Sequence, residues 1–216
     1  GAHAGAYACL CHYPGGYEKA FRGIRLLREQ GVDVKVGGSL TPANRKDLDR
    51  LLDLEQQLGV PVRVDTYMLP AVRERSLPYD PQSRLEPEAA AEARIHALKR
   101  EMGPELFPQY VLQAVEQADR PEQGKEAPVQ MACMAGQCSF TINWQGEMRP
   151  CVILNKPAFS VFELGFEEAW KRMVEETGKI RLNSKCSVCR VRHLCRTCAA
   201  SALLEAGSFE AVPEYM

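Results

Sequence analysis

Seven of the nine cysteines in this 216-residue chain fall within one stretch, from Cys133 to Cys198, and the other two are Cys9 and Cys11. The count is odd, and the first residues have neither the basic segment nor the apolar run of a secretory signal. Both features disfavour a disulfide framework. Clustered cysteines in a reducing compartment usually bind a metal, so we expect a cytoplasmic metal-binding protein.

The spacing of the last four cysteines indicates a soft metal centre. Two residues separate Cys186 from Cys189, and two separate Cys195 from Cys198. Such a gap lets the intervening turn aim both sulfurs at one centre, and thiolates select zinc or iron–sulfur clusters. The alternative is a set of buried free thiols, which pack like small hydrophobic side chains.

Cys133, Cys138 and Cys151 form a second group of cysteines. A hairpin predicted to turn at Gly146 would return Cys151 to the neighbourhood of the other two. The two groups together hold seven cysteines, one fewer than two four-cysteine sites require. A competing interpretation, a zinc-binding structural or interaction module, uses only the last four cysteines and leaves this second group unexplained.

Charge and hydropathy exclude two kinds of partner. The chain has 27 basic and 28 acidic side chains and a net charge of −1. A nucleic-acid-binding protein is expected to show a clear basic excess. No apolar run approaches the ~20 residues that cross a bilayer. We therefore expect neither nucleic acid nor membrane as a partner.

The first part of the chain has the pattern of βα units. A helix is predicted over 17–30, and valines alternate in two short segments that begin at 32 and at 60, a step of 28 residues. Thr41 is placed to cap the helix between them, which predicts parallel strands joined by a helical crossover. Two or three such units cannot close a sheet, so we expect the chain to begin inside a larger α/β domain, the alternative being that it pairs with a partner.

A loop, several helices, a linker and a hairpin are predicted for the rest of the chain. Residues 67–86 are predicted to be a long loop, residues 87–102 and 105–118 helices, and residues 119–128 a polar linker. A hairpin (140–144 and 147–152), an amphipathic helix (163–176) and a short helix (199–205) are predicted to follow. The domain boundaries expected are 1–85, 86–128 and 129–216.

Three motifs together resemble the SPASM domain of radical S-adenosylmethionine (SAM, or AdoMet) enzymes. They are C-x-A-G at Cys133 to Gly136, G-x4-C at Gly146 to Cys151, and C-x2-C-x5-C-x2-C from Cys186 to Cys198. Residues 1–85 resemble the later βα units of the radical SAM barrel. The resemblance implies an α/β fold class, in which the C-terminal half of a partial (β/α) barrel is followed by a small α+β cysteine-rich domain.

The resemblance also implies two auxiliary [4Fe–4S] clusters with crossed ligands. The first would be held by Cys133, Cys138, Cys151 and Cys198. The second would be held by Cys186, Cys189 and Cys195, with a fourth cysteine expected just beyond Met216. His193 is an alternative ligand, although a loop histidine is the simpler interpretation.

The SAM-cleaving cluster of the family requires a C-x3-C-x2-C motif, which this sequence lacks. Cys9 and Cys11 have the wrong spacing, and we predict that they are packing residues. The chain is therefore expected to be a fragment that is inactive alone. The intact enzyme would add the N-terminal half of the barrel, SAM with its own [4Fe–4S] cluster, and an external electron donor.

Ligands of parallel α/β barrels gather at the carboxyl ends of the strands. Five residues at two such ends are candidates for the SAM pocket, namely Gly37, Gly38, Ser39, Asp65 and Tyr67. An ordinary βα turn is the alternative. Arg73, Arg75 and Arg84, in the following loop, are interpreted as solvated.

The resemblance implies a peptide or protein substrate and an oxidoreductase or maturase activity. Anaerobic sulfatase maturases carry an aspartate directly after the cysteine that corresponds to Cys151, where this chain has Val152. That difference favours a maturase of ribosomal peptides, of the kind that forms thioether links, over a sulfatase maturase.

Overall fold

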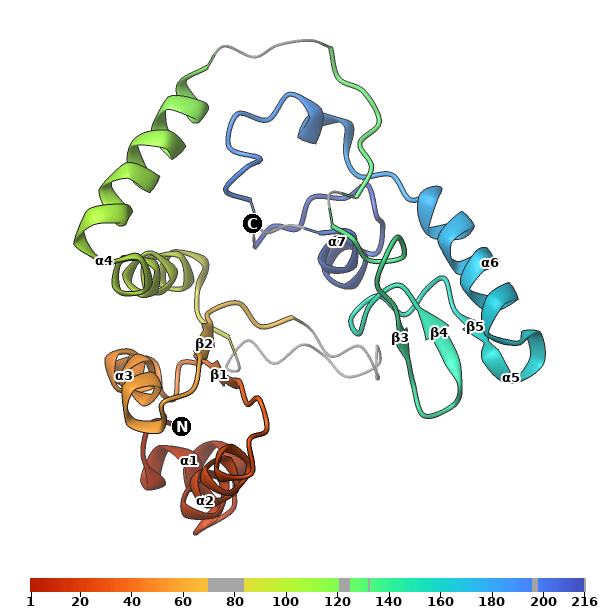
Figure 1. Ribbon diagram of the computed structural model, residues 1–216. Helices are drawn as coiled ribbons and strands as arrows, with labels where there is room; N and C mark the ends of the chain where they lie inside the picture. The colour runs from red at the N-terminus through yellow and green to blue at the C-terminus, as the bar shows by residue number, and fades with distance from the viewer. Residues whose placement is uncertain (70–83, 121–124, 132, 196–197, 216) are drawn as a thin grey trace. The chain divides into compact units, whose positions relative to one another are not determined.

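The computed structural model describes residues 1–69, 84–120, 125–131, 133–195 and 198–215, and these form a mixed α/β protein (Figure 1). The chain divides into two compact units. The first contains Gly1–Met68 and the described residues of Tyr79–Tyr110, and the second contains the described residues of Leu69–Pro78 and Val111–Met216. The predicted loop at 67–86, with Arg73 and Arg75, lies mostly outside the described residues, as does Met216.

The first unit contains a two-stranded parallel sheet with helices around it (Figure 1). Strands β1 (Val36–Ser39) and β2 (Val62–Asp65) pair so that Val36 lies opposite Val62 and Ser39 opposite Asp65. This confirms the predicted parallel pairing. The helical elements of the unit are α1 (Ala4–Cys11), α2 (Gly16–Glu29), η1 (Arg45–Asp47), α3 (Leu48–Leu58) and the first part of α4 (Pro87–Asp119).

The predicted position of the first strand is wrong by four residues. The alternating valines suggested a strand from 32, but β1 begins at Val36 and continues through the two glycines. The reason lies at the end of α2, where Gly31 is left-handed (φ 74°) and the N–H of Val32 donates to the carbonyl of Leu27 at 3.0 Å. That bond terminates the helix, so Val32 has no N–H left for a strand ladder.

The predicted cap of the next helix is also wrong. Thr41 was expected to cap it directly, whereas α3 begins at Leu48 after a turn that Asn44 holds together. Oδ1 of Asn44 accepts hydrogen bonds from N of Thr41 (2.7 Å) and from its Oγ1 (3.1 Å), and Nδ2 donates to the carbonyl of Ser39 (3.0 Å). Asn44 is buried, so these bonds satisfy a side chain that would otherwise be costly to bury.

The core of the first unit lies between α3 and the sheet. Leucines of α3 and valines of β2 are buried there. The buried face of α3 consists of Leu48, Leu51, Leu54 and Leu58. Further along the chain, Gly103 (φ 72°, ψ −179°) interrupts α4 and confirms the predicted division into two helices near 87–102 and 105–118.

The second unit is built around a three-stranded antiparallel sheet beside a helix (Figure 1). Its strands are β3 (Thr141–Ile142), β4 (Glu147–Arg149) and β5 (Phe159–Ser160). The β3–β4 hairpin confirms the prediction, with Gly146 left-handed at φ 76°. Strand β5 was not predicted. The helical elements are α5 (Val161–Leu164), α6 (Phe166–Gly178), η3 (Ser184–Ser187) and α7 (Ala199–Ala206).

Two small cores stabilise the second unit. One contains Met148 of β4 with Ala169 and Met173 of α6. The other contains four buried residues, Leu154, Ile180, Ala199 and Ala200. In the parts of the chain that the structure describes, no helix is both long and apolar enough to span a membrane.

Candidate functional site

The loop that carries Cys133 and Cys138 is closed by main-chain hydrogen bonds. The N–H groups of Gln137 and Cys138 both donate to the carbonyl of Met134, at 3.0 and 3.1 Å. Gly136 is left-handed (φ 69°), and a Cβ atom there would lie 2.5 Å from Cγ2 of Thr177 in α6. The glycine of the C-x-A-G motif is therefore required by both backbone and packing, and both cysteines of the loop are exposed.

Cys151 and Cys198 come from distant parts of the sequence and pack against the same core of Leu154, Ile180, Ala199 and Ala200. The Sγ atom of Cys151 accepts a hydrogen bond from N of Leu154 at 3.2 Å. Cys198 caps α7, and its Sγ accepts from N of Ser201 at 3.5 Å. Hydrogen bonds to the cysteine sulfurs and exclusion of solvent both affect the reduction potential of an iron–sulfur cluster.

The third group is formed by Cys186, Cys189 and Cys195, and the last two lie near enough to affect the pKa of Cys186. Burial raises the pKa of the Cys186 thiol, Arg192 acts in the opposite direction, and the neighbouring thiols of Cys195 and Cys189 raise it further. Nη1 of Arg192 also lies 3.5 Å from the carbonyl oxygen of Cys186. A bound metal cation stabilises the thiolate, so coordination would favour ionisation of a thiol whose pKa is raised in the metal-free protein.

The segment before Cys133 is attached to the segment around Cys186 by three hydrogen bonds. N of Leu182 donates to the carbonyl of Val129 at 2.7 Å. Oγ of Ser184 donates to Oε2 of Glu126 at 2.8 Å, and Oγ of Ser187 accepts from N of Ala127 at 3.1 Å. These bonds place the two cysteine-bearing segments next to each other.

The nine cysteines all lie in the described ranges, and none of them forms a disulfide. Within the described ranges, no three His, Cys, Asp or Glu side chains lie in an arrangement that would hold a metal ion. His193 has another partner, since its Nε2 lies 3.2 Å from the carbonyl oxygen of Ala114 in α4. Cys9 and Cys11 are exposed on α1, so the expectation that they are packing residues is wrong.

The residues proposed for SAM binding lie together at the end of the parallel sheet. Gly37, Gly38 and Ser39 belong to β1 itself, and Asp65 is the cross-strand neighbour of Ser39. A Cβ atom at Gly37 would meet nothing within 4 Å, so neither backbone nor packing within the described chain requires a glycine there. Asp65 pairs with Nε of Arg63 at 2.8 Å, and Tyr67 follows in the chain with a partner of its own.

Sequence reasoning missed one residue that shapes this edge. Asn44 bonds to the carbonyl of Ser39 and so fixes the turn that leaves the strand. Asparagine just before a helix is a common turn signal, but the Thr-Pro pair at 41–42 also indicates a helix start and was followed instead.

The chain is distantly similar to a known AdoMet-dependent enzyme. No protein-family profile matches the chain. The relative is the AdoMet-dependent heme synthase of Methanosarcina barkeri (strain Fusaro / DSM 804), which is 24% identical over 222 residues. The match covers 97% of this chain and 63% of the relative, so the chain spans less than two thirds of that protein's length.

Proposed function

We propose that this chain is the cluster-bearing portion of an AdoMet-dependent radical enzyme. The observation that carries the proposal is that Cys151 and Cys198, far apart in the sequence, share one apolar core and each accept a main-chain N–H. The distant homology to an AdoMet-dependent enzyme over nearly the whole chain supports it. When bound, iron–sulfur clusters carry single electrons, and AdoMet supplies a carbon radical on reductive cleavage.

The residues of this chain would hold the clusters and shield them. Cys133, Cys138, Cys151 and Cys198 would hold one auxiliary [4Fe–4S] cluster, and Cys186, Cys189 and Cys195 would hold part of a second. The N–H groups of Leu154 and Ser201 would stabilise negative charge on the sulfurs that they contact. The core around Cys151 and Cys198 would exclude water from the first cluster.

The end of the parallel sheet would contribute to the AdoMet pocket. The open space beside Gly37 leaves room for a ligand to approach the backbone. Ser39 and Asp65, side by side across the two strands, offer a hydroxyl and a carboxylate to the hydroxyl and amino groups of such a ligand. Cleavage of AdoMet belongs to the intact enzyme with an external electron donor.

Two substrate classes are candidates. A peptide or protein substrate remains a prediction from the SPASM resemblance. The similarity to the Methanosarcina heme synthase favours a heme precursor instead. The two classes are distinguished by incubating the full-length enzyme with AdoMet, dithionite and one candidate substrate, either an iron porphyrin or a peptide from a neighbouring open reading frame. The substrate that stimulates formation of 5′-deoxyadenosine identifies the class.

Electron paramagnetic resonance of the reduced, anaerobically purified protein tests the cluster proposal. We expect Cys151→Ala to remove one set of [4Fe–4S]⁺ signals and Cys189→Ala the other, while Cys9→Ala, on the exposed α1, leaves both. A protein without such signals would contradict the proposal. Binding of zinc by the last four cysteines alone would favour the structural module.

A further inference from the structure

The stretch that joins α6 to α7 carries an unbalanced positive charge (Figure 1). From Thr177 to Leu204 the sequence contains six of the 27 basic side chains and none of the 28 acidic ones. The chain as a whole has a net charge of −1, so this stretch differs from the rest of the protein. A concentration of charge of one sign attracts a partner of the opposite sign.

Part of this charge is exposed on one compact turn, residues 189–195, which we call the basic turn. Main-chain hydrogen bonds close it, because N of Arg192 donates to the carbonyl of Cys189 and N of Cys195 donates to the carbonyl of Val191, both at 3.2 Å. Every residue of the basic turn is exposed. Arg190 and Arg192 therefore lie close together on the surface, and neither forms an ion pair with another described residue.

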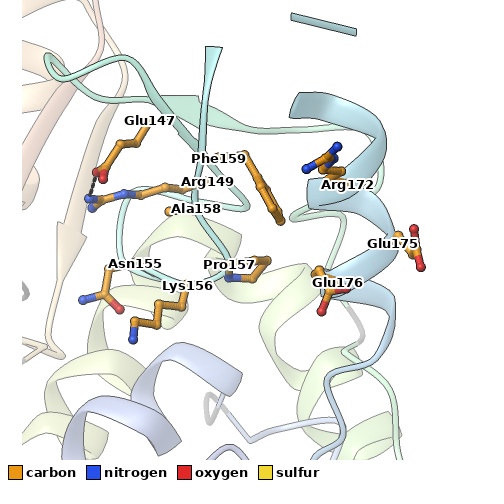
Figure 2. Close-up of a pocket in the computed structure, with 10 residues that line it drawn as sticks. All are labelled: Glu147, Arg149, Asn155, Lys156, Pro157, Ala158, Phe159, Arg172, Glu175 and Glu176. Atoms are coloured by element: carbon orange, nitrogen blue, oxygen red, sulfur yellow. Dashed lines mark hydrogen bonds and ion pairs between the residues drawn. The ribbon is translucent and has the colours of Figure 1, made fainter. Parts of the chain in front are cut away.

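The pocket beside α6, in the same unit, has the opposite character (Figure 2). Figure 2 shows Glu147 paired with Arg149 at this pocket. Its charged lining is balanced and consists of three acidic residues (Glu147, Glu175 and Glu176) and three basic ones (Arg149, Lys156 and Arg172). A partner that recognises charge would therefore be attracted to the basic turn and not to this pocket.

Two apolar side chains accompany the charges of the basic turn. Val191 is 50% exposed and Leu194 is 41% exposed. Protein–protein interfaces combine apolar contacts with a polar rim, and arginine is enriched in them. Surfaces that bind single-stranded nucleic acid without sequence preference use aromatic side chains, on which the bases stack, and the stretch from Thr177 to Leu204 contains none. The composition therefore favours a protein partner with an acidic face.

The basic turn also carries Cys189 and Cys195, both exposed. The proposed function assigns these two cysteines to the second cluster, so a partner bound at Arg190 and Arg192 would lie next to that cluster. Proteins that exchange electrons bind one another through small interfaces, below about 1,200 Å². An interface of that size can be centred on a single exposed turn.

We propose that the basic turn is the docking surface for an acidic protein that carries single electrons. The acidic face of the partner follows from the charge of the turn, whereas its role in electron transfer rests on the proposed function. In each encounter the carrier would lose one electron and the cluster that Cys189 and Cys195 help to hold would gain it, with no bond formed or broken.

The test uses the full-length, anaerobically purified protein and three probes. Flavodoxin is the acidic carrier of single electrons, cytochrome c is a basic one, and an unstructured single-stranded DNA represents nucleic acid. Biolayer interferometry measures the dissociation constant of each. We expect saturable binding of flavodoxin alone, weakened at least tenfold between about 0.05 and 0.5 M salt, because salt screens exposed charges. Flavodoxin binding that salt does not weaken would overturn the proposal.

Replacement of both arginines locates the docking surface. Arg190→Gln combined with Arg192→Gln should weaken flavodoxin binding at least about tenfold, because the interface loses two charges. Arg22→Gln combined with Arg25→Gln, which removes two exposed charges from α2, is the matched control and should change binding less than about twofold. An equal loss in both pairs would overturn the assignment to the basic turn. So would binding of DNA or cytochrome c that the Arg190 and Arg192 replacements abolish.

The iron and sulfide content of the same samples separates this inference from the proposed function. Protein that contains both clusters but does not bind flavodoxin would overturn the docking surface alone. Protein that binds flavodoxin through the basic turn but contains no iron would overturn the proposed function and retain the docking surface. Far-ultraviolet circular dichroism verifies that each variant is folded.

Discussion

Cys151 and Cys198 lie on one apolar core, and the Sγ atom of each accepts a main-chain N–H, from Leu154 at 3.2 Å and from Ser201 at 3.5 Å. Cys151 follows the β3–β4 hairpin, whereas Cys198 is the last cysteine in the sequence. In the crossed assignment these two residues hold the same cluster, whereas in the zinc-module interpretation Cys198 works only with Cys186, Cys189 and Cys195.

Replacement of Cys198 separates these assignments. We expect Cys198→Ala to lower the iron content of the anaerobically purified protein by about half, because one of two clusters loses a ligand. Iron and acid-labile sulfide per chain provide the measurement. Cys11→Ala, which changes an exposed thiol of α1, is the control and should retain full content. Equal loss of both clusters would count against crossed ligands.

Gly136 should be irreplaceable in the loop between Cys133 and Cys138. Gly136→Ala meets both a left-handed backbone (φ 69°) and the side chain of Thr177 at 2.5 Å. We expect it to lower the free energy of unfolding by about 2–4 kcal/mol, as strain and overpacking combine. Urea unfolding provides the measurement. Gly178→Ala is the matched control, since its Cβ would meet nothing within 4 Å, and an equal loss there would contradict this explanation.

Asp49 of α3 should make the stability of the first unit sensitive to acid. Its pKa is lowered by a hydrogen bond from His96 (2.7 Å) and by one from Arg100 (3.2 Å), both in α4. A lowered pKa stabilises the folded state above the ordinary value of 3.8, and that stabilisation is lost as the pH falls through the lowered pKa.

The comparison of Asp49→Asn with the wild type measures this contribution. Because Asp49 is exposed, the difference in unfolding free energy should be below about 1 kcal/mol at pH 6 and should approach zero once the pH is below the lowered pKa. Asp33→Asn, also exposed in the first unit, serves as the control. A difference that grows as the pH falls would have the wrong sign for this account.

The sequence predicted which helices and strands form better than it predicted the residues at which they begin and end. The repeated valine pattern gave the parallel pairing, but the ladder between Val36 and Val62, which depends on long-range contacts, decided where β1 begins. Strand β5 was missed because two residues carry no periodicity, and only pairing with β4 defines them. Asn44 was missed because Thr41 and Pro42 formed the more familiar start of a helix, and the three hydrogen bonds of Asn44 depend on the folded turn.

The cysteine-bearing segments were predicted in part. The turn at Gly146 and the helix that Cys198 caps follow from local patterns, and both are present. Cys151 and Cys198 share a core because both pack against Ile180 and Leu154. The spacing of the cysteines does not predict these contacts. Thiols are drawn into a tight cluster by the metal itself, because metal binding and folding are coupled.

The metal content of the anaerobically purified protein tests the central claim most directly. The account predicts a brown protein with iron and acid-labile sulfide in equal amounts, about four of each per cluster. A colourless protein with one zinc ion per chain and no sulfide would contradict it.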